Sequence, residues 1–376
     1  MPATEEQNPL PSRFLSELAG SVGNFGTVLP FLFAISVACG MDISLMLFWA
    51  AVWYGICGLY YRIPIPVEPL KAIGAIAIAD NLAPHIIAAS GILVGVICFF
   101  IGVFGCMNRI RKVIPESVIR GVQLGLAFIL VKSAIPGFII PDLTFTSVSI
   151  GIILLFYLIR KFYKVPDLSA LCIIGAGFLV SFIFAGLPTF TTFPVPGLVI
   201  PSPEDFFTAT VVLLPPQLPL TLTNAILATS LLVTDLFART ENPDRLSKTI
   251  GVMSISSSLF GGFPMCHGAG GLAAHYRFGA RGGLSLLFGG LFLLLIAGIC
   301  ADPAIVNALP IGMFGILLIV VAFELAKHGI KTKRWLVTGI IAVLSIPFGL
   351  AVSFCIGLLV AWTLRYREKI MGDEIP

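Results

Sequence analysis

The chain has 376 residues, of which 57% are hydrophobic and only 11% are charged, and its mean hydropathy is +1.02. Soluble globular proteins carry about 25% charged residues, so this chain cannot cover a water-facing surface. The composition excludes a soluble enzyme, a nucleic-acid-binding protein and a disordered scaffold, and it indicates an all-α protein that crosses a lipid bilayer many times. The net charge of +4 says less than the positions of the charges.

Hydrophobic stretches separated by charges or by Pro and Gly clusters predict fourteen membrane segments. They cover about 15–39, 44–60, 69–80, 86–105, 117–133, 146–159, 168–187, 214–235, 247–260, 267–276, 283–300, 304–326, 335–347 and 350–365. Two of them, 69–80 and 267–276, are too short to cross roughly 30 Å of hydrocarbon at 1.5 Å per residue. Each follows a Pro-containing extended stretch. We therefore expect two broken half-helices, which a membrane tolerates only where protein or a water-filled cavity receives the exposed backbone.

The basic residues give an independent test of this count. If the N-terminus is cytoplasmic and every segment reverses the side, 21 of the 23 Lys and Arg residues fall on the cytoplasmic side. Only Lys71 and Lys132 remain within the membrane, and the long external stretch 187–213 has no basic residue. The distribution predicts a multi-pass protein of the cell membrane with both termini in the cytoplasm.

Fourteen segments divide into seven plus seven, and an odd number per half forces the two halves into inverted topology. Weak internal similarity agrees, because Leu18–Asn24 matches Leu218–Asn224 and the two broken segments align through Pro66 and Pro264. We predict a cytoplasmic tail at 1–14, a first repeat at 15–187, an external linker at 188–213, a second repeat at 214–367 and a cytoplasmic tail at 368–376.

In an inverted repeat the two half-helices meet near the membrane midplane with their N-termini facing each other. Each N-terminus offers unpaired backbone N–H groups and the positive end of the helix dipole, which together form an anion site. The second half-helix begins Cys266-His267-Gly268-Ala269-Gly270, and its small residues let an oxyanion approach the N–H groups closely. The alternative is that these small residues only allow tight helix packing.

Glu68 and Lys71 form the one acid–base pair within the first broken segment. Ionisable side chains inside a membrane are costly, so a function is their default interpretation. Lys71 can supply positive potential, while Glu68 is a candidate proton carrier that is protonated when an anion is bound, because burial favours the neutral carboxyl. The alternative is a pair that only neutralises its own charges.

Uncharged polar side chains complete the candidate site. Asn24, Gln123 and Asn224 offer amide donors, although hydrogen bonding between helices is the alternative for each. His267 can donate to an anion or titrate near neutrality, and the alternative is a hydrogen-bonded core histidine. The eight Cys residues show no ligand spacing, so we expect no metal site, no disulfide framework and no cofactor.

Three sequence motifs carry a family resemblance: PVEPLKA at 66–72, FPMCHGAGGLA at 263–273 and YRFGAR at 276–281. Together they resemble the molybdate-transporter family of the sulfate permease superfamily, in the branch without a C-terminal STAS domain. The resemblance implies the uracil-permease-type fold, in which a core domain holds the substrate and moves against a gate domain, and in which homodimers are common. The family form has Gln where this chain has Glu68, a difference that bears on proton coupling and charge selectivity.

These observations favour a secondary active transporter that imports molybdate or sulfate with protons by alternating access. The anion is expected between the two half-helix N-termini, in contact with Asn24, Glu68, Pro69, Lys71, Gln123, Asn224, Cys266, His267, Gly268, Ala269 and Gly270. Two alternatives stay open, namely transport of another anion such as bicarbonate or of a nucleobase on the same fold, and a passive anion channel. No HExxH motif or Asp-rich cluster supports an intramembrane enzyme.

Overall fold

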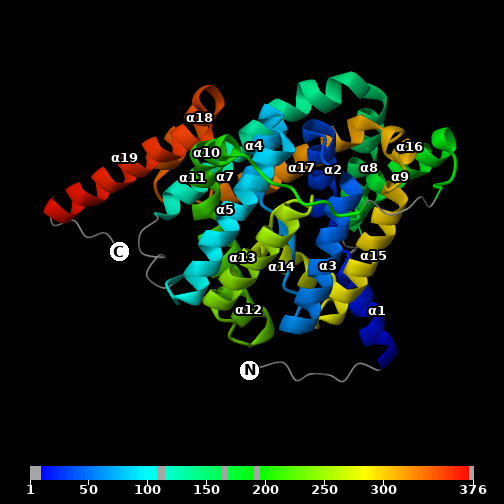
Figure 1. Ribbon diagram of the computed structural model, residues 1–376, viewed down its shortest axis with the longest axis horizontal. Coiled ribbons are helices and arrows are strands. Elements are labelled where there is room, and N and C mark those ends of the chain that lie inside the picture. The colour runs from blue at the N-terminus through cyan, green and yellow to red at the C-terminus, as the bar shows by residue number, and fades with distance from the viewer. Residues whose placement is uncertain (1–9, 108–114, 163–167, 190–194, 372–376) are drawn as a thin grey trace.

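The computed structural model describes residues 10–107, 115–162, 168–189 and 195–371, which are almost entirely helical (Figure 1). Four basic residues that were expected on the cytoplasmic side, Arg109, Arg111, Lys112 and Lys164, lie outside these described residues.

The first half of the chain contains α1 (Leu10–Ser21), α2 (Phe25–Cys39), α3 (Ile43–Tyr61), β1 (Glu68–Pro69), α4 (Lys71–Asp80), α5 (Pro84–Val103), α7 (Glu116–Ala134), the π-helix η1 (Ile135–Ile139), the 3-10 helix η2 (Ile140–Asp142), α8 (Leu143–Phe162) and α9 (Ser169–Ala185). The second half contains α10 (Pro203–Thr208), the π-helix η3 (Ala209–Leu213), α11 (Leu214–Leu220), the π-helix η4 (Thr221–Ala228), α12 (Thr229–Phe237), α13 (Pro243–Leu259), β2 (Met265–Cys266), α14 (Ala269–Arg277), α15 (Leu284–Cys300), α16 (Pro303–Asn307), α17 (Ile311–Gly329), α18 (Trp335–Phe348) and α19 (Leu350–Met371).

Many of these helices have the length and composition of membrane spans. Within the described ranges, seven helical runs are long and apolar enough to cross a bilayer: Phe14–Cys39, Ile43–Tyr61, Pro84–Val103, Glu116–Ile159, Pro203–Phe237, Ile311–Gly329 and Leu350–Arg367. Three shorter helices, α9, α15 and α18, are also apolar. The prediction of a polytopic, all-helical membrane protein is confirmed at this level.

The start of the second half differs from the expectation. The predicted linker 188–213 was expected to end at a helix beginning near residue 214, but the helical run begins at Pro203. Ser202 and Asp205 form a capping box there, with Pro203 in the first turn, where a missing N–H costs nothing. The prolines of α11 lie near the start of the predicted segment 214–235, and two flanking π-helices, η3 and η4, accommodate them. At the other end of the chain, α1 begins at Leu10, inside the predicted N-terminal tail.

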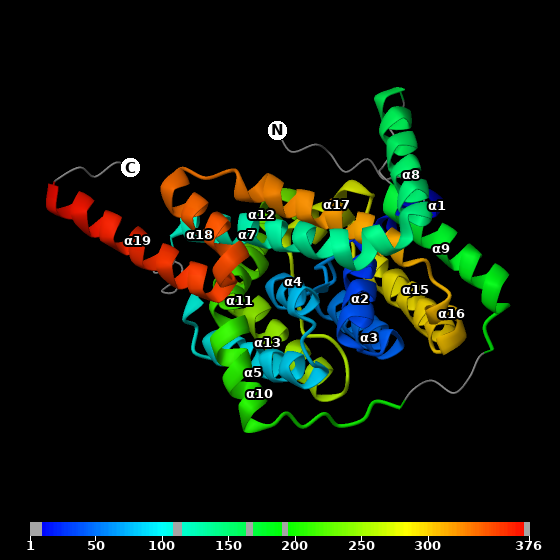
Figure 2. The same ribbon diagram turned by 90° about the horizontal axis from the view of Figure 1, so that it is seen from above.

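The helices pack in two groups. Viewed from above, α7, α17 and α18 lie together along one side, α3, α5 and α13 lie along the other, and α4 and α11 lie between them (Figure 2). Small residues let paired helices approach closely, as membrane helices require. For example, a side chain on Gly283 would collide with the carbonyl group of Gly58 where α15 meets α3.

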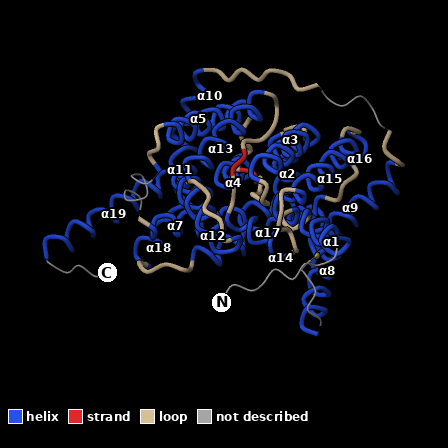
Figure 3. The backbone as a smooth tube through the Cα atoms, turned by 90° about the horizontal axis from the view of Figure 1, so that it is seen from below, coloured by secondary structure: helices blue, strands red, loops and turns tan. Residues whose placement is uncertain are grey.

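Two very short strands bring the broken segments together at the centre of the molecule (Figure 3). β1 and β2 pair antiparallel, with Glu68 opposite Cys266 and Pro69 opposite Met265. The backbone N–H of Leu70 also donates to the carbonyl oxygen of Pro264, at 3.0 Å. Because the strands are antiparallel and each leads directly into a half-helix, α4 and α14 extend from this point in opposite directions (Figure 1). Both segments that were predicted to be broken thus consist of a short extended strand followed by a short helix.

Candidate functional site

The centre of the site is a buried ion pair. Lys71 Nζ lies 2.6 Å from Glu68 Oε2, and the Glu68 and Lys71 side chains are 1% and 17% exposed. Glu68 is held in the extended β1 segment and Lys71 is the first residue of α4, so the pair closes over the N-terminus of this half-helix. A hydrogen-bonded charge pair of this kind satisfies both ions where bulk water does not reach the carboxylate.

The Glu68 carboxylate also lies against the N-terminal turn of α14. A side chain on Gly268 or Gly271 would collide with one of the Glu68 carboxylate oxygens. The glycines therefore make room for the acid of the other half-helix, and Gly271 is a site residue that the sequence did not single out. Gly270, which was expected to contact substrate, lies on an exposed part of α14, and no atom lies within 4 Å of the place its side chain would occupy.

A second side chain occupies the N-terminus of α4. Gln217 Oε1 accepts hydrogen bonds from the backbone N–H groups of Ala72 and Ile73, at 2.9 and 3.1 Å. Gln217 Nε2 in turn donates to Thr221 Oγ1 at 2.8 Å. A neutral amide oxygen thus takes two of the donors that the half-helix would otherwise offer to an anion.

The sequence analysis missed Gln217 and Thr221, although a signal was present. Gln217, Thr221 and Asn224 are polar residues spaced by four and three positions in a stretch that is otherwise apolar apart from Thr223, so they lie along one helix face. Of the three, the sequence analysis singled out Asn224 alone.

A small cavity of about 10 Å³ lies between these groups, and its wall contains Glu68, Lys71, Gln217, Leu220, Thr221, Asn224, Ala225, Cys266 and His267. Five of the predicted site residues are thus brought together: Glu68, Lys71, Asn224, Cys266 and His267. The volume suffices for one water molecule. A tetrahedral oxyanion is larger than a water molecule and does not fit this volume.

The remaining predicted residues lie near this cavity or further away, and none of them lines it. Pro69 pairs with Met265 in the strand ladder, and Ala269 is the first residue of α14. Asn24 lies at the break between α1 and α2, with its Nδ2 atom close to Gly271. Gln123, in α7, accepts a hydrogen bond from Arg120 Nη1 at 3.3 Å.

His267 has protein partners at both ring nitrogens. Nδ1 lies 2.8 Å from the carbonyl oxygen of Pro66 and Nε2 lies 2.8 Å from Thr249 Oγ1. A carbonyl oxygen can only accept, so Nδ1 carries the hydrogen and Nε2 accepts from the threonine hydroxyl. Tyr61 extends the chain, because its hydroxyl lies 2.6 Å from Thr249 Oγ1. This geometry favours the alternative of a core histidine that holds the extended segment before β1.

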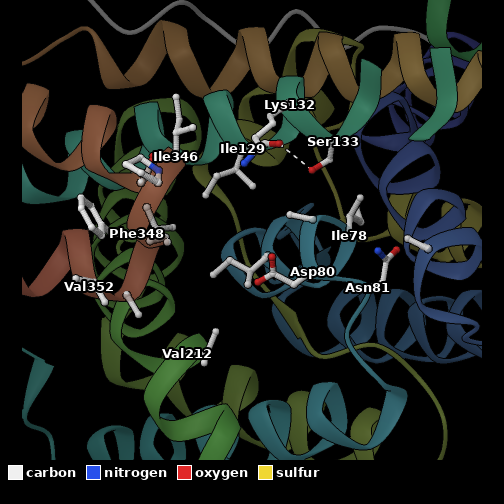
Figure 4. Close-up of a pocket in the computed structure, with 18 of the residues that line it drawn as sticks. Ile78, Asp80, Asn81, Ile129, Lys132, Ser133, Val212, Ile346, Phe348 and Val352 are labelled. Carbon is white, nitrogen blue, oxygen red and sulfur yellow. Dashed lines mark hydrogen bonds between the residues drawn. The ribbon is translucent and has the colours of Figure 1, made fainter. Parts of the chain in front are cut away.

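A much larger cavity of about 1070 Å³ borders the other end of α4 (Figure 4). Its walls come from the second half of α4, from α7 and η1, and from the turn between α18 and α19. Figure 4 shows Lys132 on the α7 wall and Asp80 and Asn81 at the end of α4. Ile76, which also lines this cavity, is five residues from Lys71, roughly 7.5 Å along the helix axis. The large cavity therefore approaches the small one along the length of α4.

No cluster of three or more metal-ligating side chains occurs within the residues that the structure describes. The eight Cys residues are free thiols.

The fold is that of a polytopic membrane transporter. The transmembrane domain of a cyanobacterium bicarbonate transporter, BicA, matches it with a TM-score of 0.68 over 93% of this chain and 97% of that chain, at 16% identity. Murine Slc26a9, an anion transporter solved in the inward-facing state, matches with a TM-score of 0.71 over 96% of this chain and 70% of that chain, at 14% identity.

The chain belongs to the molybdate transporter family, described as molybdate transporters of the MFS superfamily, whose sequence profile matches residues 16–130 and 209–325. Molybdate transporters 2 and 1 of Arabidopsis thaliana are each 31% identical to it, over 85% and 83% of this chain and 79% of each relative. The resemblance inferred from the three motifs is confirmed, and the chain is a transporter and not an enzyme.

The contact between Glu68 and α14 gives a first prediction. Gly271→Ala should displace the carboxylate, because the new methyl group would occupy the space of Glu68 Oε1. We expect a loss of about 1–3 kcal/mol in stability, the usual range for overpacking, measured as a lower midpoint of thermal unfolding in detergent. Gly270→Ala is the matched control and should leave the midpoint unchanged or raise it. Equal midpoints for the two variants would contradict the placement of Glu68.

The ion pair gives a second prediction. Lys71→Met removes the cation and keeps most of the side-chain volume, leaving a buried carboxylate without its partner. Breaking one half of a buried pair costs about 3–5 kcal/mol, so this variant should unfold at a clearly lower temperature. The double variant Lys71→Met with Glu68→Gln should recover most of the loss, because neither charge remains. If the double variant is as unstable as the single one, Lys71 stabilises the fold through packing and not through its charge.

Proposed function

We propose that this protein imports a tetrahedral oxyanion, molybdate or sulfate, together with protons, by alternating access. The observation that carries the proposal is the buried Glu68–Lys71 pair, which lies between the N-termini of two half-helices deep within an apolar helical protein. Membership of the molybdate transporter family supports molybdate as the first substrate to test.

The packing of the helices supports a fourteen-segment, seven-plus-seven inverted repeat. In such a repeat, every contact between two segments has a counterpart between the equivalent segments of the other half. Three pairs of contacts follow this rule. The contact of α3 with α15 corresponds to that of α13 with α5, and the contact of α2 with α9 corresponds to that of α11 with α19. The contact of α7 with α18 corresponds to that of α17 with α8. We assign α1–α5 and α11–α15 to the core domain and α7–α9 and α17–α19 to the gate domain.

The distribution of Lys and Arg supports a cell-membrane orientation with both termini inside. In that orientation the large cavity lies on the external side, since it is bordered by the ends of α4 and α18 that face away from the basic loops. We propose that it is the entry vestibule between core and gate. Lys132, on its wall, supplies a positive charge that attracts anions from outside.

Substrate binding then replaces contacts that the protein makes with itself. Gln217 leaves the N–H groups of Ala72 and Ile73, and the oxyanion takes its place. Lys71 turns from Glu68 to the dianion, since its flexible ammonium can reach either partner. Glu68, now beside a dianion and without its cation, binds a proton. One proton therefore accompanies the anion when the core moves against the gate.

Uptake into proteoliposomes tests the function as a whole. We expect radiolabelled molybdate to accumulate against its gradient when the outside is acidic, with sulfate competing and bicarbonate and uracil competing poorly. Accumulation excludes a passive channel, whereas strong competition by bicarbonate or uracil would move the substrate class to one of the alternatives.

Coupling is tested by Glu68→Gln, whose amide imitates the protonated acid. This variant should exchange molybdate across the membrane but lose acid-driven accumulation by about tenfold or more, the effect of removing a positioned proton-transfer group. Acid-driven accumulation at the wild-type level would show that Glu68 does not carry the coupled proton.

The proposed role of Gln217 predicts the direction in which its removal changes molybdate affinity. Gln217→Ala removes the competing acceptor and enlarges the cavity, so the oxyanion becomes the remaining partner of two backbone donors. Each hydrogen bond is worth roughly 0.5–1.5 kcal/mol, and we expect molybdate to bind about five- to tenfold more tightly, measured by equilibrium binding. Gln123→Ala, a buried amide outside the cavity, is the control and should leave affinity unchanged. Weaker binding by Gln217→Ala would instead make Gln217 a direct ligand of the substrate.

A further inference from the structure

Three buried polar atoms without a hydrogen-bond partner lie beside α14. They are Asn24 Nδ2, Tyr54 Oη and His275 Nε2, and these residues are 2%, 0% and 0% exposed. Asn24 Nδ2 lies near Tyr54 Oη, but the two do not have the geometry of a hydrogen bond. Across the part of the chain that the structure describes, one other buried side-chain atom lacks a partner, Ser258 Oγ, which lies against Gly91 of α5. The three atoms come from the α1–α2 break, from α3 and from the last turn of α14, so the tertiary structure gathers them from distant parts of the sequence.

The three atoms lie along the face of α14 that contacts the Glu68 carboxylate. Gly268, Gly271 and His275 are spaced by three and four residues and therefore share one face of α14. Glu68 Oε1 and Asn24 Nδ2 both lie within 3 Å of the position that a side chain on Gly271 would take. One helical turn further along, the His275 ring meets the Tyr54 ring edge-to-face with centroids 6.1 Å apart.

The hydrogen bonds of His275 fix its tautomer. Nδ1 lies 2.8 Å from the carbonyl oxygen of Gly20, which can only accept, so Nδ1 carries the hydrogen. Nε2 therefore presents a bare lone pair, while Asn24 Nδ2 and Tyr54 Oη present N–H and O–H donors. Leaving such groups unpaired costs about 1–3 kcal/mol each. A water molecule can pair with both kinds of group, because it accepts from the donors and donates to Nε2.

The other charged groups on the elements around α14 have their own partners or are exposed. Lys71 is bound to Glu68. Glu17, on α1, accepts hydrogen bonds from the backbone N–H groups of Arg281, Gly282 and Ser285. Asp235, on α12, is exposed. Glu68 is thus the acid, and Tyr54 the phenol, that face the imidazole of His275.

We propose that Asn24, Tyr54 and His275 form an internal hydrated site through which His275 receives the proton that Glu68 releases. The protonated Glu68 gives its hydrogen to the bound water while that water gives a hydrogen to His275 Nε2. The water is regenerated, Glu68 becomes a carboxylate and His275 becomes an imidazolium. The carboxylate is then free to pair again with Lys71, which withdraws the cation from the oxyanion.

The position of His275 gives this transfer a direction. α14 runs from the ion pair toward the loop that contains Arg281, and His275 lies in its last turn. The proton therefore moves away from the large cavity, toward the side that the basic residues place in the cytoplasm. The inference rests on the proposed proton coupling and adds the route by which the proton leaves the substrate site.

The test compares two transport modes of the full-length protein in proteoliposomes. His275→Asn keeps a donor for the Gly20 carbonyl oxygen but cannot take up a proton. We expect its molybdate/molybdate exchange and its molybdate affinity to stay within about twofold of wild type, whereas acid-driven molybdate accumulation falls at least about tenfold. His85→Asn, the same substitution at an exposed histidine, should retain both activities.

Three results would overturn the relay. The first is wild-type accumulation by a well-folded His275→Asn variant. The second is an equal loss of exchange and accumulation in that variant, which would assign His275 a packing role. The third is a wild-type protein that exchanges molybdate without responding to acid, and this result would remove the proposed coupling as well, so the two failures are distinguishable. If His275→Asn does not fold, Tyr54→Phe is tested instead, because it keeps the ring and deletes one donor to the water. Acid-driven accumulation should then fall at least about threefold while exchange is retained. Unchanged accumulation would overturn the relay.

Discussion

The structure depends on one constraint: backbone polar groups exposed where two helices break inside a membrane must find partners within the protein. The protein meets this constraint three times at the same place. β1 and β2 pair with each other, Gln217 accepts from the first turn of α4, and His267 donates to the carbonyl oxygen of Pro66. The result is a polar centre that is enclosed by apolar helices and held in position from both halves of the chain.

The same contacts explain why the site is small in this conformation. A half-helix N-terminus attracts negative charge or an acceptor, and here the acceptors are side chains of the protein. Gln217 serves α4 and the Glu68 carboxylate lies against the first turn of α14. An oxyanion that binds as proposed competes with these internal groups, so its net affinity is the difference between two similar sets of interactions. That balance suits a transporter, which must bind its substrate on one side and release it on the other.

In the proposed transport cycle, charge balance links the anion to the proton. With no substrate, Glu68 and Lys71 neutralise each other at 2.6 Å. A dianion that takes Lys71 leaves Glu68 with a negative charge that the low-dielectric surroundings oppose. In this proposal a proton restores the balance, and the buried group formed by Asn24, Tyr54 and His275 receives it. In the proposed cycle the Glu68 carboxyl and the Lys71 ammonium therefore act as one unit with two states.

Several features of the fold and of the candidate site could be predicted from the sequence. The shortage of charged residues identified a membrane protein, and the PVEPLKA and CHGAGG segments marked the half-helices and the Glu68–Lys71 pair. The one-sided distribution of Lys and Arg predicts an orientation. These features are local or compositional, because solvation by lipid acts on every segment separately. The helix start at Pro203 was missed, since prolines that normally end a helix are accommodated there by π-helical turns.

What the sequence could not decide is which side chains meet. Gln217 lies 145 residues from Ala72, and His275 lies 255 residues from Gly20, so neither partnership leaves a trace in local spacing. The sequence determined that two helices break, that an acid and a base lie at the first break, and that small residues begin the second. Only the tertiary structure decided that Gly271 and not Gly270 faces Glu68, and that three unpaired polar atoms gather behind it, because these depend on the rotation and packing of helices against one another.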